Sequence, residues 1–163
     1  MHHHGYVWTG SREAFDREGD RRPPADDPPP PPTSEDDKDG HRLHQRYREA
    51  AAEFRTGGVP PIQTAHWLLK PADLVCGTWQ EPKEAAAWLD DRLREYAPWF
   101  GSPQEQRPNH LSALVDRAAE RLSWGGDVSW GFYLARPSYV SLAVVTCSPN
   151  RAEPLTPCPS GHR

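Results

Sequence analysis

Proline constrains this chain more than any other residue, because it lacks a backbone N–H and fixes φ. Seven of the 19 prolines lie between Pro23 and Pro32, and four more lie in residues 149–163. The run Pro28–Pro32 favours an extended polyproline II segment, and the acidic block Ser34–Asp39 after it is equally unsuited to a core. We therefore predict a disordered Pro-rich and acidic arm over residues 1–40 and a Pro-rich tail over residues 149–163.

Residues 41–58 are predicted to form an amphipathic helix followed by a glycine linker. Leu43, Tyr47 and Phe54 recur at helical spacing, and Gly57 is a typical helix stop. Asp39 is the expected N-cap. The apolar stripe is narrow, because alanines fill its other positions. The helix is therefore expected either to pack on the folded domain or to fold against a partner.

A folded domain is predicted over residues 59–148, and it contains two clearer helices. The first begins near Pro82, which suits the first helical turn, and ends at Pro98. The second extends from about Asn109 to Ser123, where leucines, alanines and a valine form a continuous apolar stripe. About 90 residues are enough for one modest core.

Short apolar segments supply the strands of the predicted sheet. Residues 74–79 favour a strand, and residues 128–134 alternate between apolar and small or polar side chains. Residues 139–147 form the second strand of a hairpin, and both of its faces are apolar or small. Such a strand is typically central and covered on both sides. The fold class is therefore α+β: two or three helices packed on a small antiparallel sheet with a C-terminal β-hairpin, flanked by disordered tails.

Composition narrows the cellular setting and the partners. The formal charge is −4, so bulk electrostatics make nucleic acid an unlikely partner. The mean hydropathy is −0.86, and the apolar stretch Val140–Val145 is far too short to cross a bilayer. Arginine outnumbers lysine 16 to 3, as in proteins of GC-rich bacteria. Three cysteines without a signal peptide favour a reduced, cytoplasmic protein with no membrane contact.

One spacing suggests metal chemistry. Cys147, Cys158 and His162 are separated by ten and three residues, and thiolate and imidazole groups are the ligands that zinc prefers. A fourth ligand would have to come from Cys76, His110 or His66. The alternative interpretation is that Cys147 is a buried strand residue and that the other two belong to the tail. We favour that alternative and predict no cofactor.

Three consecutive histidines follow the first methionine. His2–His4 could chelate a metal, but they could equally be the remnant of a purification tag. The sequence alone therefore supports no functional claim for them.

No catalytic motif stands out. The phosphate-binding, dinucleotide-binding, nucleophile-elbow and zinc-protease patterns are all absent from the sequence. The paired carboxylates lie on the polar sides of the predicted helices, where neighbouring arginines account for them. We therefore favour a protein that is not an enzyme.

Aromatic residues gather around the predicted hairpin. We predict a binding face formed by Trp124, Trp130, Tyr133, Arg136 and Tyr139. The leading hypothesis is a small domain that contacts an unknown protein partner or a second copy of itself, as a homodimer through the hairpin. The first alternative is a winged-helix DNA-binding regulator, and the second is a small Cys/His metal-binding protein or enzyme.

Overall fold

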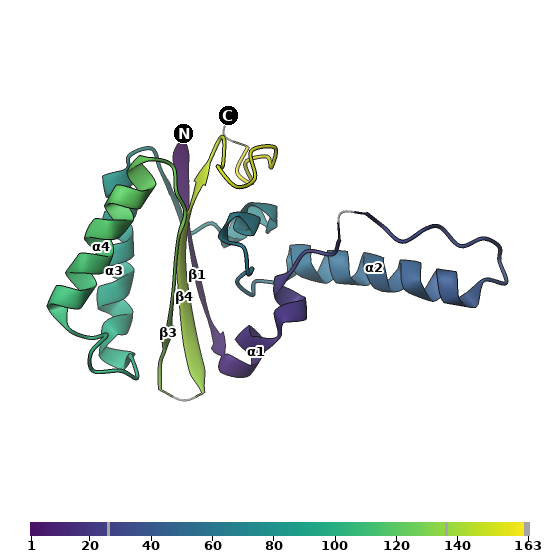
Figure 1. Cartoon of the computed structure of the whole chain (residues 1–163). Helices are drawn as coiled ribbons and strands as arrows, with labels where there is room; N and C mark the ends of the chain where they lie inside the picture. The colour runs from purple at the N-terminus through teal and green to yellow at the C-terminus, as the bar shows by residue number, and fades with distance from the viewer. Residues whose placement is uncertain (26, 136, 162–163) are drawn as a thin grey trace.

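The computed structural model describes residues 1–25, 27–135 and 137–161. The expected α+β class with a C-terminal β-hairpin is confirmed. The strands are β1 (His2–Ser11), β2 (Gly77–Trp79), β3 (Val128–Tyr133) and β4 (Ser138–Cys147). The α-helices are α1 (Arg12–Asp16), α2 (Lys38–Thr56), α3 (Pro82–Tyr96) and α4 (Pro108–Ser123). A four-stranded sheet stands at the centre, with α3 and α4 against one face and irregular segments, α1 and α2 on the other side (Figure 1).

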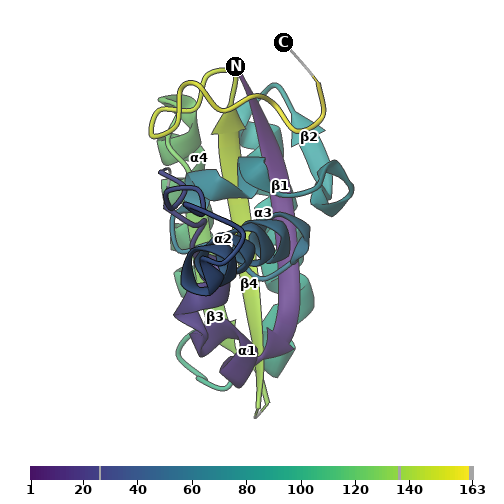
Figure 2. The same cartoon turned by 90° about the vertical axis from the view of Figure 1, so that its right-hand side faces the viewer.

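The sheet is antiparallel throughout, in the order β2-β1-β4-β3. Strands β1 and β4 pair along ten residues, from His2 opposite Cys147 to Ser11 opposite Ser138. The beginning of β1 and the end of β4 therefore lie side by side, and the tail that follows β4 lies at the same end of the molecule as the N-terminus (Figures 1 and 2).

Strand β1 corrects the expectation of a disordered arm over residues 1–40. His2, His3, His4 and Tyr6 are all buried. Gly5 lets the strand approach the aromatic rings of α3 and β2, because a Cβ there would lie only 2.8 Å from a ring carbon of Trp88. The prediction rested on the prolines and acidic residues further along the chain. It took no account of the β-forming residues Tyr6, Val7, Trp8 and Thr9 that come before them.

The central position expected for β4 is observed. On one face of the sheet, Val140, Leu142 and Val144 contribute to the core formed with α3 and α4. On the other face, Ala143 and Val145 belong to a second cluster with Trp67 and Leu68, which lie in the 3₁₀ helix η2 (Thr64–Leu69). The chain itself therefore covers both faces of β4.

Element boundaries differ slightly from the predictions. Helix α3 begins at Pro82 as expected, whereas α4 begins at Pro108 and not at Asn109. Proline at the first helical position costs no hydrogen bond, so the helix starts one residue earlier. Strand β2 is limited to Gly77–Trp79, because Ala72–Leu74 form the short 3₁₀ turn η3 after Pro71. The remaining 3₁₀ elements are η1 (Glu18–Arg21) and η4 (Ala97–Trp99).

Helix α2 projects away from the sheet (Figures 1 and 2). Its N-cap is Asp37 and not Asp39, because the Asp37 carboxylate accepts from the Gly40 N–H at 2.9 Å. Only Phe54 of this 19-residue helix is buried. No described helix is both long and apolar enough to cross a membrane.

Candidate metal centre

The pairing of β1 and β4 places three ligand-type side chains on one face of the sheet. Side chains two residues apart in a strand point to the same face, so His2 and His4 lie together. His2 is directly opposite Cys147, and directly opposite residues share a face as well. All three side chains are buried.

The tail contributes a fourth ligand because Asn150 turns the chain back. Its side-chain amide donates to the Thr146 carbonyl at 2.7 Å and to the Asp127 carboxylate at 3.0 Å. Its side-chain carbonyl accepts from the backbone N–H groups of Ala152 and Glu153. Asn150 is only 1% exposed, so the start of the predicted tail belongs to the folded structure. The turn directs Cys158 toward the first strand.

Four ligand atoms converge at this point. The side chains of His2, His4, Cys147 and Cys158 each offer one atom, and these atoms all lie within 4.8 Å of one another. The two imidazole Nε2 atoms are 3.0 Å apart, and Cys158 Sγ is 3.3 Å from His4 Nε2 and 3.4 Å from His2 Nε2. A tetrahedral zinc with bonds of about 2.0–2.3 Å separates its ligand atoms by roughly 3.3–3.8 Å. The spacings among His2, His4 and Cys158 lie within about 0.3 Å of that range, and the 4.8 Å limit on the set leaves at most about 1 Å for Cys147 to close.

A hydrogen bond holds the orientation of the His4 ring. Its Nδ1 lies 2.8 Å from the Thr78 hydroxyl oxygen on β2. With the proton on Nδ1, the ring donates to Thr78 and leaves the Nε2 lone pair facing the other ligand atoms. Metal-bound histidines almost always hold their second nitrogen in this way.

His3 lies between two of the ligands but points to the opposite face. Its Nδ1 is 3.0 Å from the Thr146 hydroxyl, which itself donates to the Gly126 carbonyl. Burial, with smaller contributions from His2 and the N-terminal amine, lowers the pKa of His3 to about 4. His3 is therefore a neutral, hydrogen-bonded part of the sheet and not a ligand.

The ligand set determines which metal fits. Two thiolates and two imidazoles are typical of structural zinc sites, whereas magnesium and calcium prefer oxygen ligands. Burial raises the pKa of the Cys147 thiol, so in the absence of metal this group holds its proton more tightly. A divalent cation would replace that proton and compensate the buried thiolate charge.

The sequence identified half of this cluster. Cys147 and Cys158 come together as the spacing suggested, while His162 lies outside the described residues. None of the three residues considered for the fourth position belongs to the cluster: Cys76, His66 and His110. Cys76 is exposed, and His66 contacts Glu153 at 3.4 Å.

Two of the three consecutive histidines, His2 and His4, complete the cluster. A tag remnant would extend into solvent, but His3 and His4 are fully buried in β1. The signal that could have revealed them is the strand pattern of the first eleven residues, in which His2, His4 and Tyr6 share one face with Trp8.

The aromatic residues predicted to form one binding face are divided between the two ends of β3. Tyr133, at the end of β3, contacts Tyr139 edge-on, with their ring centroids 5.4 Å apart. The ring centroids of Phe15 and Tyr139 are 4.3 Å apart. Trp124 precedes β3 at the other end. The Arg151 guanidinium lies over its ring, with Cζ 4.9 Å from the ring centroid. Trp130 is half-buried against the main core. Arg136 lies outside the described residues.

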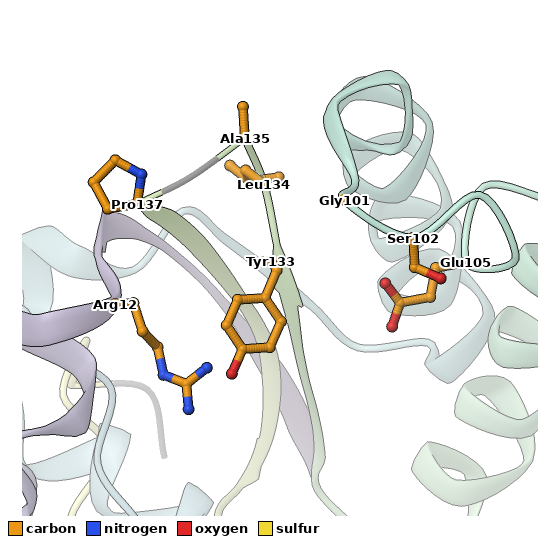
Figure 3. Close-up of a pocket in the computed structure, with 8 residues that line it drawn as sticks. All are labelled: Arg12, Gly101, Ser102, Glu105, Tyr133, Leu134, Ala135 and Pro137. Atoms are coloured by element: carbon orange, nitrogen blue, oxygen red, sulfur yellow. The ribbon is translucent and has the colours of Figure 1, made fainter.

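A cavity of about 790 Å³ lies beside the Tyr133 end of the hairpin (Figure 3). Arg12 and Tyr133 form one wall, and Ser102 and Glu105 stand on the opposite side (Figure 3). The Arg12 guanidinium is already paired with Asp16 at 2.6 Å and lies over the Tyr133 ring at 4.4 Å. Its charge is therefore compensated within the protein, and the cavity offers less specific chemistry than the cysteine–histidine cluster.

The geometry gives no support to DNA binding. The hairpin strands β3 and β4 are two of the four strands of one sheet, and do not form a separate wing. Helix α4 lies along that sheet and buries Leu111, Ala118 and Leu122 in the core. A recognition helix would need a free surface rich in positive charge.

Comparison with known proteins adds no relative. No family model, no curated protein and no solved structure matches this chain.

Proposed function

We propose that this protein binds one zinc ion through His2, His4, Cys147 and Cys158. The observation that carries the proposal is the convergence of four ligand atoms within 4.8 Å from three separate parts of the chain. The contact between His4 and Thr78 supports it, because it holds the ring with Nε2 toward the other ligand atoms, as metal-bound histidines are held by a partner on their second nitrogen.

The proposed zinc is structural and not catalytic. Four protein ligands complete a tetrahedral site and leave no position for water or substrate. The ligands come from the first strand, the end of the central strand and the tail, so the ion would connect all three. Binding free energy of this kind adds directly to folding stability.

Metal analysis of the full-length reduced protein tests the proposal. We expect one zinc per chain, and Co²⁺ substitution should give the visible absorption of a tetrahedral site with thiolate ligands. The Cys158→Ser variant should lose this site, because Cys158 is half-buried in the tail and its replacement removes one ligand with little disturbance of the core. The matched control is Cys76→Ser, which alters an exposed thiol outside the cluster.

Two results would contradict the proposal. One is a reduced protein that contains no zinc and takes up none on titration. The other is zinc binding that survives Cys158→Ser unchanged, because adjacent histidines alone would then explain it.

Contact with a protein partner is a second candidate function, and helix α2 supports it. This helix projects from the sheet (Figure 1). Leu43 on it is 54% exposed. Sedimentation velocity of the full chain tests the homodimer form of this proposal. We expect self-association that weakens in Leu43→Ser, and a strict monomer at high micromolar concentration would contradict it.

A further inference from the structure

We infer that the zinc centre is a redox switch, in which oxidation joins Cys147 to Cys158 and releases the ion. The inference rests on the proposed zinc binding and concerns the regulation of that same site. Cys147 and Cys158 are the two thiols of the cluster, and they lie in parts of the chain with very different packing.

The first argument is distance. The two Sγ atoms lie within 4.8 Å of each other, and a disulfide requires about 2.05 Å. Closure therefore needs a movement of less than about 3 Å. Cys147 is held in the central strand and is fully buried, whereas the positions before Cys158 are mostly exposed. The tail can supply the movement without disturbing the sheet.

The second argument is access. Cys158 is partly exposed and Cys147 is buried, so a small oxidant reaches Cys158 first. Cys147 then stands beside it as the resolving thiol. The third cysteine, Cys76, is exposed and does not belong to the cluster. It is therefore not placed to form a disulfide with either cluster thiol.

Hydrogen peroxide represents the class of oxidant. The Cys158 thiolate attacks one peroxide oxygen, the S–O bond forms as the O–O bond breaks, and hydroxide leaves as water after protonation. The Cys147 thiolate then attacks the sulfenic sulfur, the S–S bond forms, and the second oxygen leaves as water. Two thiolates, one peroxide and two protons thus give one disulfide and two waters.

Oxidation removes half of the metal ligands. Two electrons pass from the sulfurs to peroxide, and Zn²⁺ keeps its oxidation state. A disulfide no longer offers thiolate ligands, so only His2 and His4 remain to hold the ion. Two neutral imidazoles bind zinc far more weakly than a complete site, and the ion dissociates. A thiol reductant should reverse the change.

Peroxide titration of the zinc-loaded full-length Cys76→Ser protein tests the inference. A chromogenic chelator follows zinc release, and peptide mass mapping locates the disulfide. We expect one zinc released per chain, in step with a Cys147–Cys158 disulfide, and full zinc uptake after reduction. The native chain should behave in the same way, because Cys76 plays no part.

The outcomes separate the two proposals. If the reduced protein contains no zinc, the proposed function fails and the switch fails with it. If zinc is bound but stays in place under peroxide, or leaves with Cys158 oxidised to sulfinic acid and no disulfide, only the switch is overturned. Zinc release without renewed uptake after reduction overturns it as well.

Discussion

Thr78 contacts the His4 nitrogen that lies away from the other ligand atoms. Its hydroxyl is 2.8 Å from His4 Nδ1, so Thr78→Val removes the hydrogen bond but keeps the shape of the side chain. We expect zinc affinity to fall about 10- to 100-fold, because partners that orient a metal-bound histidine typically contribute that much. Competition with a calibrated chelator measures the change. Thr9→Val, at an exposed position of β1, is the matched control, and equal affinities for both variants would contradict the role of Thr78.

Lys70 is a buried, charged side chain that directly follows η2, the 3₁₀ helix that contributes to the second core cluster. It is 3% exposed, its ammonium donates to the Phe54 carbonyl, and burial lowers its pKa to about 8 from 10.5. Between these two pH values the unfolded chain binds more protons than the folded one, so stability should rise with pH across this window. The full shift corresponds to about 3 kcal/mol.

The Lys70→Met variant isolates this titration, because it keeps the length of the side chain without the charge. Denaturant unfolding at a series of pH values from 7 to 11 should show the rise in the native chain relative to the variant. Parallel profiles for the two proteins would contradict the assignment.

At the scale of elements, β1 depends on Gly5. A Cβ at this position would come within 2.9 Å of ring carbons of both Trp79 and Trp88. These rings lie between the sheet and α3 and cannot move freely. Gly5→Ala should therefore lower the free energy of unfolding by about 1–3 kcal/mol. Urea unfolding measures the loss, and Gly19→Ala is the control, because no atom lies within 4 Å of a Cβ there.

The elements that sequence reasoning located are those whose periodicity is complete within one segment. Helix α3 and the hairpin strands β3 and β4 each carry their own apolar pattern and their own end signals. Strand β1 also alternates, with His2, His4 and Tyr6 on one face, but its first buried positions hold polar histidines, so hydrophobicity does not mark that face as buried. Their burial depends on β4, which lies more than 120 residues further along the chain. No local pattern could reveal that pairing.

At the scale of the whole molecule, the same long-range pairing explains why only half of the proposed metal site could be predicted. Cys147 and Cys158 are close in sequence, so their spacing alone suggested a site. His2 and His4 join them only because β1 aligns antiparallel to β4, with His2 opposite Cys147. The fold class could be deduced from segments, but the ligand set required the topology of the complete sheet.

Zinc removal should loosen one side of the molecule and spare the other. The ligands connect β1, the end of β4 and the tail, whereas α3 and α4 pack on the opposite face through Leu89, Leu93 and Leu122. Under a strong chelator in reducing buffer, we expect hydrogen exchange to increase in residues 148–161 and at the start of β1. Exchange in α3 and α4 should change little, because their core does not include the ligands. Uniform loss of protection across the whole chain would show that the ion supports global folding, and unchanged protection would show that it holds neither the tail nor the first strand.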